Sequence, residues 1–166
     1  MDPIPQQSVP PLIELPPLPS SDPDVDLAPD WDLGQIAKTY RTRVYEVLDQ
    51  NQAEGQSGRT LVELHTTLMD QLVSYVFTAA TRLYTRRYTS LSQRCCVFAL
   101  GGYGRGELSP HSDIDLLFLY HWKITPYAET VWETIYYSLM DAGWTVGHAV
   151  RNIRECLRQA NRDLEI

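Results

Sequence analysis

The chain has 166 residues, 43% of them apolar, and a formal net charge of −7. This length is enough for one domain of ordinary size. The acidic excess lies in residues 1–30, which hold six of the 21 acidic residues and no lysine or arginine, while residues 31–166 are close to neutral. Because no general basic surface results, the composition argues against nucleic acid as a partner.

The pattern of cysteines and the lack of long apolar runs indicate the cellular compartment of the protein. Cys95 and Cys96 are adjacent and Cys156 stands apart, which suits neither a disulfide framework nor a CxxC metal site. We interpret them as reduced thiols and expect a cytoplasmic protein. Neither a secretory signal pattern nor an apolar stretch of membrane-spanning length is visible, so no membrane association is expected.

Residues 1–30 form a distinct segment that contains nine of the 11 prolines. Proline removes backbone donors and fixes φ, so helix and sheet are both disfavoured there. Together with the acidic charge, this predicts a disordered or loosely extended tail. Two interpretations of the tail stay open: an idle segment, and a proline-rich peptide that docks onto a partner.

Residues 31–90 are predicted to form an N-terminal helical region. Apolar residues recur at helical spacing after Asp30 or Asp32, either of which can cap the first helix. The polar stretch "NQAEGQSG" at 51–58 predicts a break, and a longer helix is expected over 60–88. We interpret both helices as elements that pack against a sheet.

Residues 91–166 are predicted to form the core of the fold. Three apolar runs have the length of strands, at 94–100, 113–120 and 144–151. A glycine-rich turn separates the first two runs. A helix is expected between the second and the third.

Helix signals complete the core. Thr125 and Pro126 predict the start of the intervening helix, and Gly143 predicts its end. Asn152, followed by Glu155 three residues later, resembles a capping box for a last helix. The element order predicts an α+β fold with α/β-like layers, in which a small mixed sheet is flanked by helices and preceded by the N-terminal helices.

Two aspartates interrupt the second apolar run. Alternate side chains of a strand share a face, so Asp113 and Asp115 are expected to point the same way, with Ile114 directed into the opposite layer. Neighbouring carboxylates repel each other, and a divalent cation relieves that repulsion. Oxygen ligands of this kind suit Mg²⁺ or Mn²⁺. The alternative interpretation is a turn followed by a polar edge strand.

The turn before the aspartates is rich in glycine, at Gly101, Gly102, Gly104 and Gly106. Such a backbone lets a phosphate group approach its N–H groups, and Arg105 and Ser112 could add contacts to phosphate. Other roles stay open: tight-turn geometry for Gly104 and Gly106, an ion pair with Glu107 for Arg105, and a turn cap for Ser112. The sequence contains neither a P-loop nor a complete dinucleotide fingerprint.

The segment "FALGGYGRGELSPHSDIDLLFLY" resembles the nucleotidyltransferase motif of the polymerase-β superfamily, a strand, a Gly-Gly or Gly-Ser turn, and DxD on the next strand. The residues GGYGRGEL followed by SDIDLL resemble the bacterial PII uridylyltransferases, which are bifunctional uridylyltransferase/uridylyl-removing enzymes. The later segment "VGHAVRNIRECLRQANRDLEI" is similar to the same family. The similarity covers residues 94–166 well and the preceding helices more loosely. It implies the polymerase-β-type nucleotidyltransferase fold.

The resemblance also implies a reaction: UMP passes from UTP to a tyrosine of the PII nitrogen-regulatory signal protein, and pyrophosphate is released. Asp113 and Asp115 would be the catalytic, metal-binding residues. Gly101 and Gly102 would hold the triphosphate.

The sequence departs from the family pattern in one respect. Superfamily members use a third carboxylate from a later strand, whereas the run 144–151 contains no acid. Glu155, Asp163 and Glu165 follow it without an assignable role. We therefore expect a core truncated at its C-terminal end, without the family's uridylyl-removing and glutamine-sensing domains. Two other functions stay open: adenylyl or other nucleotidyl transfer to a different acceptor, and a non-catalytic module that binds a nucleotide or a partner.

Overall fold

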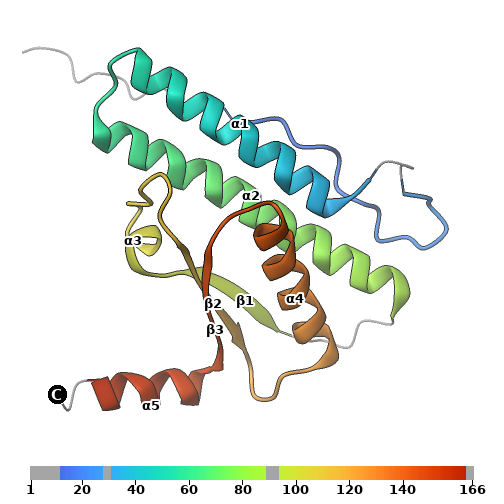
Figure 1. The fold of residues 1–166 in the computed structure, drawn as a ribbon. Coiled ribbons are helices and arrows are strands. Elements are labelled where there is room, and N and C mark those ends of the chain that lie inside the picture. The colour runs from blue at the N-terminus through green and yellow to red at the C-terminus, as the bar shows by residue number, and fades with distance from the viewer. Residues whose placement is uncertain (1–11, 28–30, 89–93, 164–166) are drawn as a thin grey trace, which may run out of the picture.

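The computed structural model describes residues 12–27, 31–88 and 94–163, and within these ranges it has five helices and three strands. The helices are α1 (Leu33–Ala53), α2 (Gly58–Arg87), α3 (Gly101–Gly104), α4 (Pro126–Asp141) and α5 (Ile153–Asp163). The strands are β1 (Cys95–Ala99), β2 (Ile114–Tyr120) and β3 (Val146–Asn152). In Figure 1, α1 and α2 form a hairpin, α4 lies beside α2, and α5 leads away from the end of β3. No helix in the described ranges is both long enough and apolar enough to cross a bilayer.

Local capping explains where two of the helices begin. The Asp32 carboxylate accepts a hydrogen bond from the Gln35 N–H at 2.7 Å, so one of the two expected caps of α1 is confirmed. The other candidate, Asp30, lies outside the described residues. Thr125 caps α4 through its hydroxyl, and Pro126 occupies the first turn, as the sequence predicts.

The first helix is longer than expected. It continues to Ala53, so the first three residues of the predicted break at 51–58 are helical. Gly55, with φ of +82°, lies two residues beyond the helix in the left-handed conformation that commonly ends helices.

The last helix begins with the expected capping box. The Asn152 N–H donates to Glu155 Oε2 at 2.8 Å, and the Glu155 N–H donates to Asn152 Oδ1 at 3.0 Å. The Tyr120 hydroxyl, at the end of β2, also donates to Glu155 at 3.1 Å. These bonds connect the start of α5 to the sheet.

The sheet has the order β1-β2-β3. The β1–β2 pair is antiparallel and the β2–β3 pair is parallel, with α4 as the crossover that a parallel pair requires. The expected α+β class, with a small mixed sheet flanked by helices, is thereby confirmed.

The two faces of the sheet differ. On β2, Ile114, Leu116 and Phe118 are fully buried, and the Phe118 ring lies 5.9 Å from that of Trp132 on α4. The residues between them on β2 are only half-buried, and Phe98 on β1 is 49% exposed. We call this second side the open face. The strand register assigns to it Cys96, Phe98, Asp115, Leu117, Leu119, Gly147, Ala149 and Arg151.

Residues 12–27 contain no helix or strand, as their proline content predicts, yet they lie against α2. The Gln71 side chain donates to the Ile13 carbonyl at 2.7 Å. The Arg86 guanidinium donates to three carbonyls, the shortest bond being 2.8 Å to Val25. This packing depends on partners that are distant in the sequence. Residues 1–11 lie outside the described ranges, and the boundary at residue 30 stays a prediction.

Candidate functional site

Asp115 lies in a space that two glycines leave free. It is the second residue of β2, it is half-buried on the open face, and it pairs with Gly147 of β3. A Cβ on Gly101 would lie 2.9 Å from Asp115 Oδ2, and a Cβ on Gly147 would overlap Asp115 Oδ1. The carboxylate therefore occupies volume that side chains at these two positions would fill.

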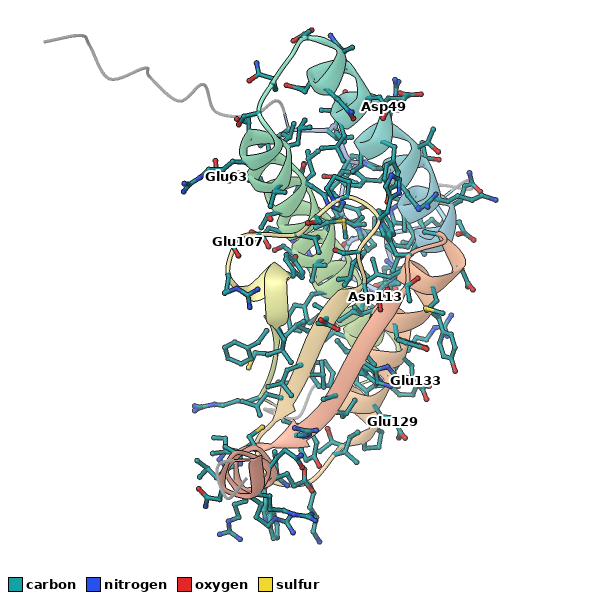
Figure 2. All side chains as sticks on the ribbon, turned by 60° about the vertical axis from the view of Figure 1, so that its left-hand side comes forward. Asp49, Glu63, Glu107, Asp113, Glu129 and Glu133 are labelled. Carbon is teal, nitrogen blue, oxygen red and sulfur yellow. The ribbon has the colours of Figure 1, made fainter. Side chains whose placement is uncertain are left out.

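Asp113 is exposed and immediately precedes β2 (Figure 2). The complete burial of Ile114 agrees with the predicted alternation, in which the two aspartates share the other side. Neither aspartate side chain has a hydrogen bond or an ion pair with any residue that the structure describes. The carboxylates of Asp113 and Asp115 are thus free to bind a cation, and their joint action on one metal stays a prediction.

The glycine turn folds into the short helix α3 instead of the expected loop. Gly101, with φ of +56°, starts it, and the Gly104 N–H donates to the Leu100 carbonyl at 2.8 Å. A Cβ on Gly104 would lie only 2.5 Å from the Ala99 carbonyl oxygen. Backbone geometry alone therefore requires glycine at 104, which favours the tight-turn interpretation for that residue.

The polar residues near the turn already have protein partners. Arg105 Nε lies 3.3 Å from Glu107 Oε2, in an exposed ion pair. The Ser112 hydroxyl donates to the Ser109 carbonyl at 2.8 Å and closes the turn before Asp113. Contacts of Arg105 and Ser112 with phosphate stay predictions. Only Nε of the Arg105 guanidinium contacts Glu107, whereas the Ser112 hydroxyl has a single proton and would have to release Ser109.

A cavity of about 580 Å³ borders this turn on the side of α2. Arg59, Glu63, Arg105 and Glu107 are among its lining residues. Figure 2 shows Glu63 and Glu107 projecting on the same side of the molecule. The cavity combines two arginines with two glutamates, so it has no net charge to attract an anion.

The donor set fits a hard cation that retains other ligands. The described ranges contain no group of three or more histidine, cysteine, aspartate or glutamate side chains that could hold a metal. Two unpartnered carboxylates, one of them beside Gly101 and Gly147, suit Mg²⁺, which commonly binds one or two carboxylates together with water and substrate phosphates.

Glu155 lies far from the aspartates. It binds Tyr120 at the opposite end of β2, and a strand of seven residues is about 20 Å long. The backbone hydrogen bond from Asn152, with smaller contributions from Tyr120 and nearby arginines, lowers the pKa of Glu155. We therefore assign Glu155 to helix capping. Of the other acids without a role, Glu165 lies outside the described residues, as does the side chain of Asp163.

The sequence did not indicate two features of the site. Gly147 has no role assigned from the sequence beyond its place in the expected strand 144–151. A glycine inside a strand often marks the close approach of another group, and in the structure that group is Asp115. His65 and Thr66 were included in a helix interpreted as packing, yet both bind the backbone of Leu108, before Asp113. No local pattern identifies such a contact, because it joins residues more than 40 positions apart.

Comparison with protein families gives a match over residues 42–150 to the family described as "Putative nucleotidyltransferase DUF294". The matched range includes the second half of α1, all of α2, β1 and β2, the first five residues of β3, and the aspartate pair.

Curated relatives with similar sequences are named bifunctional uridylyltransferase/uridylyl-removing enzyme. The protein of Rhodospirillum rubrum is 46% identical over 68% of this chain, and that of Cereibacter sphaeroides is 42% identical over 69%. The protein of Nitrobacter hamburgensis is 40% identical over 79%. The aligned residues make up 12 to 14% of the length of these relatives. No solved structure matches the chain.

Proposed function

The chain belongs to the DUF294 nucleotidyltransferase family, and from this premise we propose that it transfers UMP from UTP to a tyrosine side chain of a PII signal protein. The tyrosine hydroxyl releases its proton to water and its oxygen forms a bond to the α-phosphorus. The bond between the α-phosphorus and the oxygen that bridges it to the β-phosphorus breaks, and pyrophosphate leaves with that oxygen. The names of the curated relatives support uridylyl transfer. The acceptor follows from the resemblance of the GGYGRGEL…SDIDLL segment to the PII uridylyltransferases.

One observation carries the proposal: an unpartnered carboxylate, Asp115, occupies space left by Gly101 and Gly147 on the open face, next to exposed Asp113. Asp113 and Asp115 would hold Mg²⁺, or Mn²⁺ in its place. When bound, the cation stabilises negative charge that develops on the transferred phosphoryl group and the leaving oxygen. The role of the two aspartates would be to hold the positive charge of the cation beside the glycine turn.

The nucleotide would lie along the glycine turn. Gly101 and Gly102 leave room for the triphosphate to approach the backbone, as Gly101 already does for Asp115. Arg105 would bind a phosphate through its other N–H groups. Leaving its exposed pair with Glu107 would also cost little, because exposed ion pairs contribute only about 0–1 kcal/mol. Ser112 would donate to a phosphate oxygen after releasing Ser109.

The proposal divides the chain as the sequence predicted. Residues 1–30 are a tail, 31–90 a helical region and 91–166 the nucleotidyltransferase core. The reaction would take place in the cytoplasm, in keeping with the free thiols of Cys95, Cys96 and Cys156.

Incubation with Mg²⁺, a PII protein and UTP labelled at the α-phosphorus tests the proposal. We expect label on PII from the wild-type chain, and a loss of about a hundredfold or more in Asp113→Asn and Asp115→Asn, the scale seen when a charge-stabilising group is removed. Asp49→Asn is a matched control, because Asp49 is exposed on α1 and is labelled in Figure 2 far from Asp113.

The other outcomes of this experiment are equally definite. Label from ATP but not from UTP would replace uridylyl transfer with adenylyl transfer. Binding of UTP without any transfer would indicate a non-catalytic module. Full activity in Asp113→Asn would refute the metal role of that residue.

A further inference from the structure

The segment that connects α3 to β2 is fixed by contacts with the helical hairpin of α1 and α2. We call residues 105–112 the linking loop. Its central residue, Leu108, is 1% exposed, and both backbone polar groups of Leu108 bind side chains of α2. The loop ends at Ser112, directly before Asp113.

The first contact comes from His65. Its Nδ1 lies 3.0 Å from the Leu108 carbonyl oxygen, and because a carbonyl only accepts, Nδ1 must carry the proton. The ring is 1% exposed, and its other nitrogen, Nε2, is buried without a hydrogen-bond partner in the described structure. A buried polar atom without a partner is costly, so packing alone would favour an apolar residue at position 65.

The second contact comes from Thr66. The Leu108 N–H donates to Thr66 Oγ1 at 3.0 Å, and the Thr66 hydroxyl in turn donates to the Val62 carbonyl at 2.9 Å. The proton of this hydroxyl is thereby directed into the helix, and its oxygen is left to accept from the loop. The donor and the acceptor of Leu108 are thus both satisfied by consecutive residues of α2.

A third attachment comes from α1. The Tyr45 ring stacks on His111, with centroids 4.9 Å apart and an interplanar angle of 10°. The Arg41 guanidinium lies over the Tyr45 ring, 4.8 Å from its centroid. His111 itself has a φ of +68°, an uncommon conformation for a residue other than glycine. Both helices of the hairpin therefore hold the loop in one conformation.

We propose that His65 and Thr66 are positioning residues for the aspartate pair: they fix Leu108, and through the linking loop they set the position of Asp113 relative to Asp115. Asp115 is already fixed within β2, whereas Asp113 precedes the strand and depends on the loop. The helical hairpin is in this sense part of the metal site, and the metal part of this inference rests on the proposed function.

The loop-fixing part is tested by amide hydrogen exchange in the full chain, which needs neither metal nor substrate. Thr66→Val keeps the shape and removes the hydroxyl, and His65→Leu removes the donor. We expect the amides of residues 105–109, 111 and 112 to exchange at least about tenfold faster in both variants, because local opening becomes easier. Thr67→Val is the matched control, since the Thr67 hydroxyl donates only to the Glu63 carbonyl of the same helix. Unchanged exchange in both variants would overturn the inference.

The metal part is tested by titration with Mn²⁺ in the presence of UTP, followed by electron paramagnetic resonance. We expect the dissociation constant to rise by about tenfold in Thr66→Val and His65→Leu, the lower end of the range for residues that orient metal ligands. His65→Asn should restore binding, because its side-chain N–H can replace Nδ1–H, and Thr66→Ser should do the same. Thr67→Val should bind like the wild type.

The outcomes separate this inference from the proposed function. Faster exchange with unchanged Mn²⁺ affinity would show that the contacts serve only the fold, and would overturn the positioning role. Failure of the wild-type chain to bind Mn²⁺ would count against the proposed metal site, while hydrogen exchange would still decide whether His65 and Thr66 fix the loop. If His65→Leu does not fold, the nearly isosteric Thr66→Val decides both parts.

Discussion

At the scale of single residues, the site depends on glycines, which have no side chain, as much as on the aspartates. Asp115 fits on the open face because Gly101 and Gly147 have no Cβ. The sequence identified the two aspartates, since a DxD in an apolar run is visible locally. It could not identify Gly147 as the neighbour of Asp115, because the strand register that joins these two residues is a property of the folded sheet.

Gly147→Ala should therefore impair the site without removing any functional group. The added methyl group would displace the Asp115 carboxylate, and small displacements in such sites can cost up to about a hundredfold in rate. We expect UMP transfer to fall by at least about tenfold, measured as kcat with labelled UTP. Gly58→Ala is a control, because a Cβ at Gly58 meets no atom within 4 Å. Equal activity of Gly147→Ala and wild type would contradict this account of the site.

At the scale of elements, the signals that the sequence carries are those that neighbouring residues can satisfy. The caps of α1 and α4 and the capping box of α5 were predicted because donor and acceptor lie within three residues of each other. The helical form of α3 was not predicted. Its course depends on Gly104 fitting against the Ala99 carbonyl at the end of β1.

The start of α5 should loosen in acid. The pKa of Glu155 in the folded chain lies below its ordinary value of 4.5, so its capping bonds contribute fully above that value. They are lost as pH falls through the lower, folded pKa, because the protonated carboxyl no longer accepts as well from Asn152. The protection factors of the amides of residues 153–157, which correct for the pH dependence of intrinsic exchange, should fall between pH 7 and pH 3.

A variant of the capping residue provides the comparison. Glu155→Gln should have faster exchange at residues 153–157 already at neutral pH, and should lose most of the acid dependence. Glu133→Gln is the control, since Glu133 is exposed on α4 and projects away from α5 (Figure 2). An identical acid response in Glu155→Gln and wild type would exclude capping by Glu155 as its cause.

At the scale of the whole molecule, the layer arrangement was predictable from the order of helices and strands, and the attachments between layers were not. The helical region at 31–90 was expected only to pack against the sheet. In the structure, His65 also joins α2 to the linking loop, through a residue 43 positions away. Residues 12–27 are likewise held by Gln71 and Arg86, which composition could not indicate.

The buried histidine should make global stability depend on pH. Burial is the main cause that lowers the pKa of His65 below its ordinary 6.5, with a smaller effect of nearby His111. Between the folded pKa and 6.5, the unfolded chain binds a proton that the folded chain does not, so lowering the pH favours unfolding. The urea midpoint of the wild type should therefore fall between pH 7.5 and pH 5.5.

His65→Asn removes the titrating group and retains a donor for the Leu108 carbonyl. Its urea midpoint should fall less over the same pH range, while the other titrating groups remain common to both proteins. A variant with the same pH dependence as the wild type would show that His65 does not titrate on unfolding.

The open face of the sheet has a kinetic consequence for the proposed reaction. The long helices α1, α2 and α4 lie to one side of the sheet, and the buried side chains of β2 face α4, so the nucleotide and the acceptor protein would both reach the aspartates from the open face (Figure 1). In-line displacement needs UTP and the acceptor protein bound at the same time. An acceptor protein that bound first would block the entry of UTP, which is much smaller. Initial-rate measurements should therefore give intersecting double-reciprocal plots, as a ternary complex requires, with UTP binding before its acceptor.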